Sequence, residues 1–365
     1  MNIIIKKDNL KRAVSSVIGV VDKKQTMPIL GHILLEKNDN HLKLTATNLE
    51  VQISSTTKVV KMDDFENTAV SGRKFYEIIR SLDSKEVELT TSKGQLVIKT
   101  NSSSYKISTL SGNDFPMFDT SDSEEKFNIN QENLLTLLNK THFSMAQQDV
   151  RFYLNGLLLE TESNKMKAIA TDGHRLAASE MIIEKKQLNK TSSIVPRKAI
   201  QELIRLLDNN EDVRAEIGLN SICFTFNDLV FITKLIDGKF PDYNRVIPTN
   251  TEINIQLNSQ AFKPSLQRVS ILANEKFKGI RLETTGGSLE LSSENPEQER
   301  ANESITLQEK VKKIIVGFNV NYLIDAVSSC DGNEVCLSLN DENSSALITS
   351  PEDKNTKYVV MPMRL

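Results

Sequence analysis

Cysteine and histidine are scarce in the sequence, and neither is spaced as metal ligands are. The 365 residues include three cysteines, none in a CxxC pair, and four histidines without ligand spacing. Zinc sites need such pairs, and disulfide frameworks need an even number of cysteines. We therefore expect no metal site, and reduced thiols buried as small apolar side chains in a cytoplasmic protein. The cysteines are Cys223, Cys330 and Cys336.

Signals of membrane insertion, secretion and catalysis are also lacking. No apolar run reaches the about 18–20 residues of a membrane span, so we expect no membrane partner. The N-terminal stretch MNIIIKKDNLKRA places its charges after a very short apolar run, unlike a secretory signal. The sequence contains no GxSxG, HExxH or glycine-rich phosphate loop. We therefore expect no cofactor and no catalytic activity of the chain itself.

The net charge of −3 is unlike that of a typical nucleic-acid-binding protein, which is basic. The positive charges are nevertheless concentrated. Residues 6–24 carry six lysines or arginines and two aspartates, a net charge of +4. Arg-Lys pairs also stand at residues 73–74 and 197–198, where two further helices are predicted to begin. A basic inner surface on an acidic protein can attract DNA phosphates without reading base sequence.

The sequence repeats itself with a period of roughly 120 residues. The segment SGRKFYEIIRSLDSKEVEL from Ser71 matches VPRKAIQELIRLLDNNEDVRAEI from Val195, and the Arg-Lys pair shifts by 124 residues. A fainter copy, VGFNVNYLIDAVSSCDGNEVCLSL, starts at Val316. Polar segments separate the copies. We expect three domains, at residues 1–122, 126–248 and 249–365.

Each copy is predicted to be an α+β unit with two helices and antiparallel sheets. Apolar residues follow helical spacing after each Arg-Lys pair, and segments such as HLKLTATNLEVQISST alternate as half-buried strands do. One helix of each copy is predicted to open near a capping residue, namely Asp8, Asn130 or Asn258 to Ser259.

The stretch TDGHRLAAS, residues 171–179, admits several interpretations. His174 could act as a general base oriented by Asp172, as in a hydrolase. The Asp-Gly dipeptide is instead typical of a tight turn, and no nucleophile motif accompanies it. An open, non-ring nucleic-acid binder with basic helices is a third possibility, which salt-sensitive binding to linear DNA would favour.

Motifs along the whole chain resemble the beta subunit of bacterial DNA polymerase III, the β sliding clamp family. They are MPILGHILLE, FSMAQQDVRFYLNG, ATDGHRLA, FPDYNRVIP, NEKFKGIRL, NPEQE and the terminal YVVMPMRL. The resemblance implies three tandem DNA-clamp domains in each chain and a head-to-tail dimeric ring that encircles double-stranded DNA. It also implies a non-catalytic processivity subunit, whose partners are the clamp loader, the replicative DNA polymerase and other replication or repair proteins with clamp-binding linear motifs.

The resemblance assigns residues to DNA, to a second chain and to partner peptides. For DNA they are Lys24, Arg73, Gln148, Phe152, Tyr153, Arg197 and Lys198. For the dimer interface they are Lys74, Tyr105, Ile107, Ile271, Leu272, Glu297 and Glu299; the apolar ones could alternatively be ordinary core. The family often has arginine at Lys24 and tyrosine at Phe152, and Phe152 could instead be a core aromatic.

The partner-peptide groove implied by the resemblance combines apolar side chains with a basic rim. Apolar grooves of this kind accept the anchors of short linear motifs, and methionines adapt to different partners. Asn343 stands where the family commonly has an apolar residue. The groove residues are Leu154, Thr171, Gly173, His174, Arg175, Leu176, Pro241, Arg245, Val246, Ser345, Val359, Val360, Met361, Pro362, Met363, Arg364 and Leu365.

Overall fold

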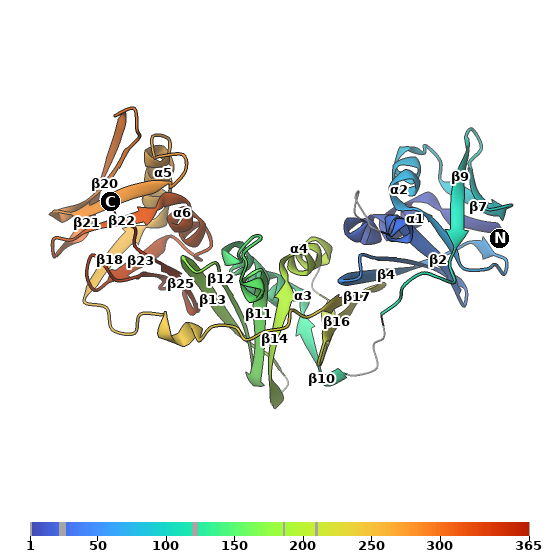
Figure 1. Ribbon diagram of the computed structural model, residues 1–365, viewed down its shortest axis with the longest axis horizontal. Helices are drawn as coiled ribbons and strands as arrows, with labels where there is room; N and C mark the ends of the chain where they lie inside the picture. Colours follow the sequence, from blue (N-terminus) through green and yellow to red (C-terminus); the bar gives the residue numbers. More distant parts are fainter. Residues whose placement is uncertain (1, 22–26, 119–122, 185–186, 209–210, 365) are drawn as a thin grey trace. The chain divides into compact units, whose positions relative to one another are not determined.

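The computed structural model describes residues 2–21, 27–118, 123–184, 187–208 and 211–364. These residues form two compact units, one of Met1–Glu132 with Gln201–Leu235 and one of Asn133–Ile200 with Ile236–Leu365. Figure 1 shows the elements in chain order. The described α-helices are α1 (Lys7–Val17), α2 (Gly72–Ser81), α3 (Gln131–Asn139), α4 (Arg197–Leu206), α5 (Ser259–Ser270) and α6 (Val320–Ser328), and the short 3-10 helices are η1 (Ile18–Val20), η2 (Pro28–Gly31), η3 (His142–Ser144), η4 (Phe152–Leu154) and η5 (Tyr243–Arg245).

The first unit is built on one antiparallel sheet with the strand order β10-β15-β16-β17-β4-β3-β2-β6-β9-β8-β7-β1-β5. Its strands are β1 (Asn2–Lys6), β2 (His32–Asn38), β3 (His41–Thr47), β4 (Val51–Lys58), β5 (Lys61–Met62), β6 (Thr68–Ser71), β7 (Glu86–Ser92), β8 (Gln95–Lys99), β9 (Ser104–Ser111), β10 (Ser123–Asn130), β15 (Asp212–Gly218), β16 (Ser221–Phe226) and β17 (Leu229–Lys234).

The second unit contains two antiparallel sheets, ordered β14-β11-β12-β13-β25-β24-β23-β18 and β21-β20-β19-β22. The strands of the larger sheet are β11 (Gly156–Ser163), β12 (Lys165–Thr171), β13 (Arg175–Ile182), β14 (Leu188–Pro196), β18 (Ile253–Asn258), β23 (Glu334–Leu339), β24 (Ala346–Ser350) and β25 (Asp353–Val360). Those of the smaller sheet are β19 (Gly279–Thr284), β20 (Gly286–Glu294), β21 (Arg300–Val311) and β22 (Ile315–Asn319).

The order of elements repeats three times, which confirms the predicted α+β fold. Each copy opens with a strand followed by a helix (β1-α1, β10-α3, β18-α5) and has a second strand–helix step (β6-α2, β14-α4, β22-α6). Strand pairing continues from one copy to the next. Leu229 of β17 pairs with Ser55 of β4, and Arg175 of β13 pairs with Val360 of β25. Backbone hydrogen bonds therefore join neighbouring copies, and the two compact units do not coincide with the three repeats.

The helix starts follow the predicted capping residues in two of three cases. The Asn258 side chain accepts hydrogen bonds from the Gln260 and Ala261 amides, and Asn130 accepts one from Glu132. Helix α1 opens near Asp8 as predicted, at Lys7, but Asp8 is not its cap, because the N-cap residue is Lys6 and makes no side-chain cap hydrogen bond. Asp8 lies in the first turn, where its charge favours the positive end of the helix dipole.

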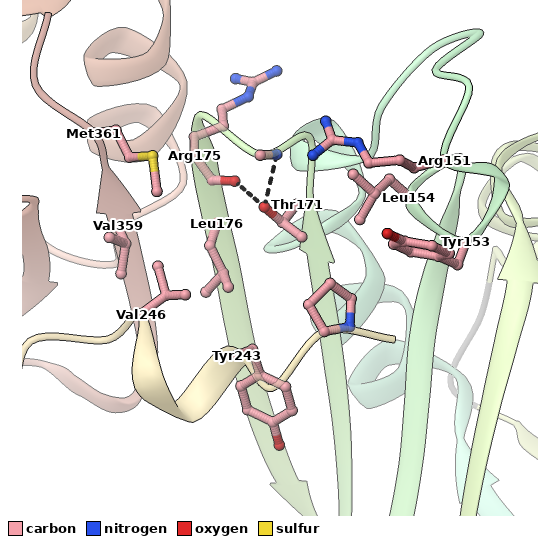
Figure 2. Close-up of a pocket in the computed structure, with 12 residues that line it drawn as sticks. Arg151, Tyr153, Leu154, Thr171, Arg175, Leu176, Tyr243, Val246, Val359 and Met361 are labelled. Atoms are coloured by element: carbon pink, nitrogen blue, oxygen red, sulfur yellow. Dashed lines mark hydrogen bonds between the residues drawn. The ribbon is translucent and has the colours of Figure 1, made fainter. Parts of the chain in front are cut away.

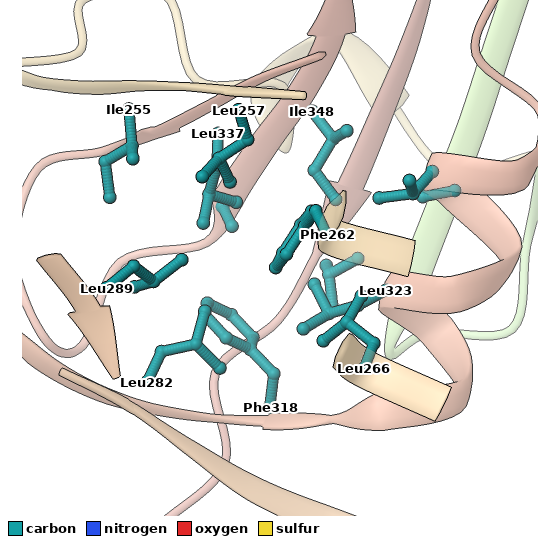
Figure 3. Packing of buried hydrophobic residues seen from close by; sticks show 14 of the residues in the cluster. Ile255, Leu257, Phe262, Leu266, Leu282, Leu289, Phe318, Leu323, Leu337 and Ile348 are labelled. Atoms are coloured by element: carbon teal, nitrogen blue, oxygen red, sulfur yellow. The ribbon is translucent and has the colours of Figure 1, made fainter. Parts of the chain in front are cut away.

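The C-terminal repeat has a core that both sheets of the second unit share (Figure 3). Alternate residues of β18, Ile255 and Leu257 among them, point inward, and α5 contributes Phe262 and Leu266 at helical spacing. Phe318 of β22 closes the opposite side from the smaller sheet and is fully buried. Each such side chain contributes about 1.5–3 kcal/mol by leaving water, so this core is a main source of stability for the C-terminal repeat.

The three cysteines are free thiols and are partly exposed, where the prediction had them buried as small apolar side chains. Burial raises the pKa of Cys330 to about 12, and it also raises the pKa of Cys223. Both thiols therefore stay protonated at neutral pH and are poor nucleophiles. Among the helices in the described part of the chain, none is long and apolar enough to cross a membrane.

Lys140, just after α3, joins the central repeat to the C-terminal repeat within the second unit. Its ammonium lies 2.6 Å from Asp331 and 2.7 Å from Asp353. The Lys140 and Asp353 side chains are only 13% and 11% exposed. Partial burial opposes ionisation of Asp353, but hydrogen bonds from Lys140, Thr356 and the Asn355 amide outweigh it and lower the pKa of that carboxyl. The ionised Asp353 carboxylate is therefore stable in this site only with the Lys140 ammonium beside it.

The substitution Lys140→Met is expected to lower the free energy of unfolding by about 1–3 kcal/mol at pH 7, because it leaves a half-buried carboxylate without a partner. Urea unfolding measures the change. Lys313→Met is the matched control, since that lysine pairs with Glu283 but is 68% exposed.

The pH dependence has a definite sign. Because the pKa of Asp353 lies below its ordinary value of 3.8 in the folded protein, the stabilisation is present above that value and is lost as the pH falls through the folded pKa. The difference between Lys140→Met and the parent should shrink in that window. A difference equal to that of Lys313→Met at pH 7 would show that the Lys140 contacts do not stabilise the protein.

Candidate functional site

The stretch TDGHR forms the tight turn between β12 and β13. Gly173 has a φ of +89°, a conformation that side chains with a Cβ rarely adopt. Asp172 Oδ1 accepts hydrogen bonds from the His174 and Arg175 amides, at 2.9 and 3.0 Å. The Thr171 hydroxyl accepts from the Gly173 amide and donates to the Arg175 carbonyl. The acid and the glycine therefore serve the turn, which holds this end of β12 and β13 in one geometry.

The guanidinium of Arg175 is engaged on every side. It donates to Asp172 at 3.1 Å, to Asp325 of α6 at 2.5 Å and to the Phe143 carbonyl at 2.7 Å. It also lies 4.5 Å from the centre of the Tyr322 ring. Its side chain is 14% exposed, so these contacts replace most of its hydration. Arg175 thus ties the turn to the C-terminal repeat.

A pocket of about 170 Å³ opens beside this turn. Figure 2 shows its side chains converging from β12, β13, η4, the segment after Phe240 and the chain just beyond β25. Apolar side chains dominate the wall. The lining residues are Arg151, Tyr153, Leu154, Thr171, Gly173, Arg175, Leu176, Pro241, Tyr243, Val246, Val359 and Met361.

The pocket rests on a small apolar core of its own. Leu158, Ile169, Leu176 and Val359 come from neighbouring strands of the larger sheet and are buried, and Phe240 packs onto them. The segment that contains η5 crosses this face of the sheet and so forms one wall. Just beyond β25, the Met361 amide donates to the His174 carbonyl at 2.9 Å. The tail after β25 is therefore fastened to the turn.

Comparison with known proteins covers the full chain. Family models of the N-terminal, central and C-terminal domains of the DNA polymerase III beta subunit match residues 1–119, 128–242 and 244–364. The beta sliding clamp of Proteus mirabilis is 39% identical, with both chains covered completely.

The chain belongs to the DNA polymerase III beta-subunit family. Its function is that of a DNA sliding clamp, which holds a polymerase on DNA. The beta subunit of Pseudomonas aeruginosa has a structure that matches with a TM-score of 0.97 at 37% identity over all of both chains. A second structure from that organism, a sliding clamp bound to griselimycin, matches with a TM-score of 0.96 at 37% identity, also over both full chains.

The structure brings part of the predicted peptide groove of this beta subunit together in the pocket. The predicted residues that line it are Leu154, Thr171, Gly173, Arg175, Leu176, Pro241, Val246, Val359 and Met361. Two assignments need correction. Arg175 lines the pocket, but its guanidinium is bound to protein groups, so the predicted basic rim lacks it. Val360 is 1% exposed and packs in the core of the C-terminal repeat, because adjacent residues of a strand face opposite sides.

The remaining predicted groove residues lie outside the pocket lining. His174 is exposed at the tip of the turn, and the Arg245 side chain is 86% exposed and pairs with Asp242. The Met363 amide donates to the Gly317 carbonyl at 2.7 Å, which adds the tail to the edge of β22. Ser345, Pro362 and Arg364 are also absent from the lining, and Leu365 lies outside the described residues.

Three pocket residues were not predicted as such. Arg151 and Tyr243 were not assigned to any site, and Tyr153 was assigned to DNA. Tyr243 stands between Pro241 and Arg245 in FPDYNRVIP, so its position beside two assigned residues was an available signal. Arg151 directly precedes the assigned Phe152 and Tyr153 in FSMAQQDVRFYLNG, which was a similar signal. Its guanidinium reaches the turn through a hydrogen bond to the Asp172 carbonyl, which depends on folding.

The residues predicted to contact DNA differ in how accessible they are. Phe152 is 73% exposed, so the alternative of a core aromatic was wrong. Gln148, four residues earlier, has a φ of +58°. Arg73 is exposed on α2. Arg197 is half-buried, and its guanidinium donates to the Met145 carbonyl, so the side chain has limited reach toward a phosphate. Burial, together with the nearby charge of Arg175, lowers the pKa of Arg197. Lys198 is half-buried, and Lys24 lies outside the described residues.

The predicted interface residues also divide by exposure. Tyr105 is 37% exposed and Ile271 is 75% exposed, whereas Ile107 is 9% exposed and belongs to the core of its own repeat. For Ile107 the core alternative is therefore the better description. Strand β9 pairs with β8 through Ser104–Ser108 and with β6 only from Thr109 on. Within the part of the chain that the structure describes, the first part of β9 thus pairs along one edge and leaves the other open. The other assigned residues are Leu272, which is half-buried, and Lys74, Glu297 and Glu299, which are exposed.

Gly173→Ala is expected to lower the free energy of unfolding by about 1–2 kcal/mol, because alanine disfavours the positive φ. The new Cβ would also lie 2.9 Å from an Arg151 nitrogen. Thermal or urea unfolding measures the effect. Gly287→Ala is the control, since a Cβ there meets no atom within 4 Å. Equal stability of the two variants would mean that the turn does not require glycine.

Proposed function

We propose that two copies of this chain close head to tail into a ring around duplex DNA, and that the pocket beside the TDGHR turn receives short linear motifs of partner proteins. The partners are the clamp loader, the replicative polymerase and other replication or repair proteins. The single observation that supports the second part is the pocket itself. It is concave, and eight of its twelve lining residues are Leu, Val, Met, Pro or Tyr. Such grooves accept apolar anchors of peptides.

The pocket also has features that suit several partners. Met361 is flexible and 38% exposed at the mouth, so it adapts to anchors of different shape. Arg151 lies at the upper edge in Figure 2 and is available to peptide carbonyls or carboxylates while it keeps its ion pair with Asp149. The related clamp from Pseudomonas aeruginosa is known in a form bound to griselimycin, so a member of this family does bind a ligand besides DNA.

A catalytic role for His174 and Asp172 is disfavoured by their contacts. One Asp172 oxygen accepts two backbone amides and the other accepts from Arg175, so neither orients the imidazole. We infer that the chain acts without chemistry of its own. A ring linked topologically to DNA raises the local concentration of a bound polymerase at the primer end. A separate ATP-driven loader opens the ring, since the chain has no phosphate-binding loop.

Retention on circular DNA tests the ring. Labelled protein is loaded onto a nicked plasmid with a bacterial clamp loader and ATP, the complex is isolated, and the circle is then cut once. We expect the label to stay on uncut circles and to leave after cutting, because a ring slides off a free end. The measurement is the fraction of label that coelutes with DNA.

Two outcomes would contradict the ring. Label that stays on cut DNA would indicate direct binding, and the open nucleic-acid binder would become the better function. Label that leaves uncut circles at the rate seen for cut ones would show that no closed ring forms. Uncut plasmid incubated without ATP is the control for loading.

The double substitution Ile271→Ala with Leu272→Ala tests the interface. Removing two interface anchors is expected to cost about 2–4 kcal/mol, which raises the dimer dissociation constant by about 30- to 1,000-fold. Sedimentation at a series of concentrations measures it. Leu219→Ala is the matched control, because Leu219 is 69% exposed but lies outside the proposed interface. A dimer as tight as that of the control would exclude these residues from the interface.

A further inference from the structure

A second, polar pocket lies next to the apolar one. Its volume is about 340 Å³, and it is lined by the ends of β11, β12 and β14 and by the segment that contains η5. Lys165, Lys167 and Lys190 supply positive charge, and Glu160 and Glu162 supply negative charge. None of these residues belongs to the groove implied by the resemblance.

Tyr243 is the partition between the two pockets, because it lines both. In Figure 2 its ring lies at the lower end of the apolar pocket, and its hydroxyl points away from the other lining side chains. The hydroxyl donates to Glu160 at 2.7 Å. Burial, with Glu160 beside it, raises the pKa of Tyr243, so the phenol keeps its proton and this contact. The ring is therefore held in place, and one carboxylate of the polar pocket is occupied.

The pairing register gives the spacing between the pockets. Thr171 lines the apolar pocket and Lys167 lines the polar one, and both are on β12. At the rise of an extended chain, four residues correspond to about 13 Å. Glu160, Lys167 and Glu180 are cross-strand neighbours, so they share one face of the sheet. An extended segment with its anchor in the apolar pocket would reach Lys167 about four residues further along.

The cations of the polar pocket retain binding capacity. Lys167 lies 3.9 Å from Glu180, too far for a hydrogen bond, while Lys165 donates to the same carboxylate at 2.7 Å. Lys190 and Glu162 are 3.2 Å apart, but their side chains are 77% and 61% exposed. An exposed pair of this kind contributes little and exchanges partners readily. Glu160 keeps its charge while it accepts from Tyr243, so Lys167 and Lys190, whose present contacts are long or exposed, are the groups through which the pocket can bind an anion.

We propose that the polar pocket binds a carboxylate of the partner segment, about four residues from the apolar anchor that occupies the first pocket. This inference rests on the proposed function of the apolar pocket. Tyr243, held by Glu160, separates the apolar pocket from the polar pocket that binds the carboxylate. Partners with an acidic residue at this spacing are then preferred over partners without one.

The test uses labelled synthetic peptides and the full-length protein. All peptides carry a Leu-Leu pair, either alone or followed by a three-residue Gly/Ser spacer and Asp-Asp, Asn-Asn or Lys-Lys; a second set places the spacer and flank before the pair. Fluorescence anisotropy measures the dissociation constants. We expect Asp-Asp in one of the two sets to bind about three- to tenfold more tightly than Asn-Asn, and Lys-Lys to show no gain.

The protein variants assign the effect to the polar pocket. Lys167→Gln with Lys190→Gln should abolish the gain for Asp-Asp and leave the unflanked peptide unchanged. The control, Lys310→Gln with Lys354→Gln, removes the same charge from exposed positions elsewhere and should keep the gain. Equal affinities for Asp-Asp and Asn-Asn in both sets, or a gain that persists in the Lys167/Lys190 variant, would overturn the proposal.

The unflanked peptide separates this inference from the proposed function. It should bind the parent protein, and Met361→Asp should weaken it, because Met361 lines only the apolar pocket. Failure of that arm would reject the apolar pocket as a motif site and the inference with it. If the unflanked peptide binds as expected but Asp-Asp and Asn-Asn peptides bind equally, only the carboxylate site in the polar pocket would be rejected.

Discussion

The contacts of the Arg175 guanidinium are the interaction on which the site depends. They join the turn between β12 and β13 to Asp325 of the C-terminal repeat and to the Phe143 carbonyl of the central repeat. A buried cation without partners would be costly, so the surrounding groups must stay in place for it. The pocket takes walls from both repeats, and its shape therefore depends on the same contacts.

The strand pairing between the repeats also holds the pocket walls together. Because β13 pairs with β25, the tail after Val360 arrives next to the turn, where Met361 reaches the His174 carbonyl. Three copies folded as separate bodies would leave these segments apart. Continuous sheets instead give the chain an apolar pocket in the second unit, although all three copies share one plan.

Much of the architecture could be predicted from local patterns. Helical spacing marked α2 and α4 after their Arg-Lys pairs, and Asn130 and Asn258 marked helix starts. These features depend on neighbours a few residues apart, so a sequence shows them directly. Asp8 does not cap α1, because a helix can start without a side-chain cap when packing stabilises it. The family motifs indicated the pocket region, but the motifs named residues without the directions of their side chains.

The sequence by itself determined the three repeats, their helices and strands, and the stretch that forms the turn, because each rests on short-range periodicity and turn chemistry. Only the tertiary structure decided which side chains are available. The Arg175 guanidinium is already bound to Asp172 and Asp325. Val360 and Ile107 face the cores of their repeats. Tyr243 and Arg151 line the pocket. These outcomes depend on partners distant in sequence, which meet when strands from different repeats pair and their faces are buried.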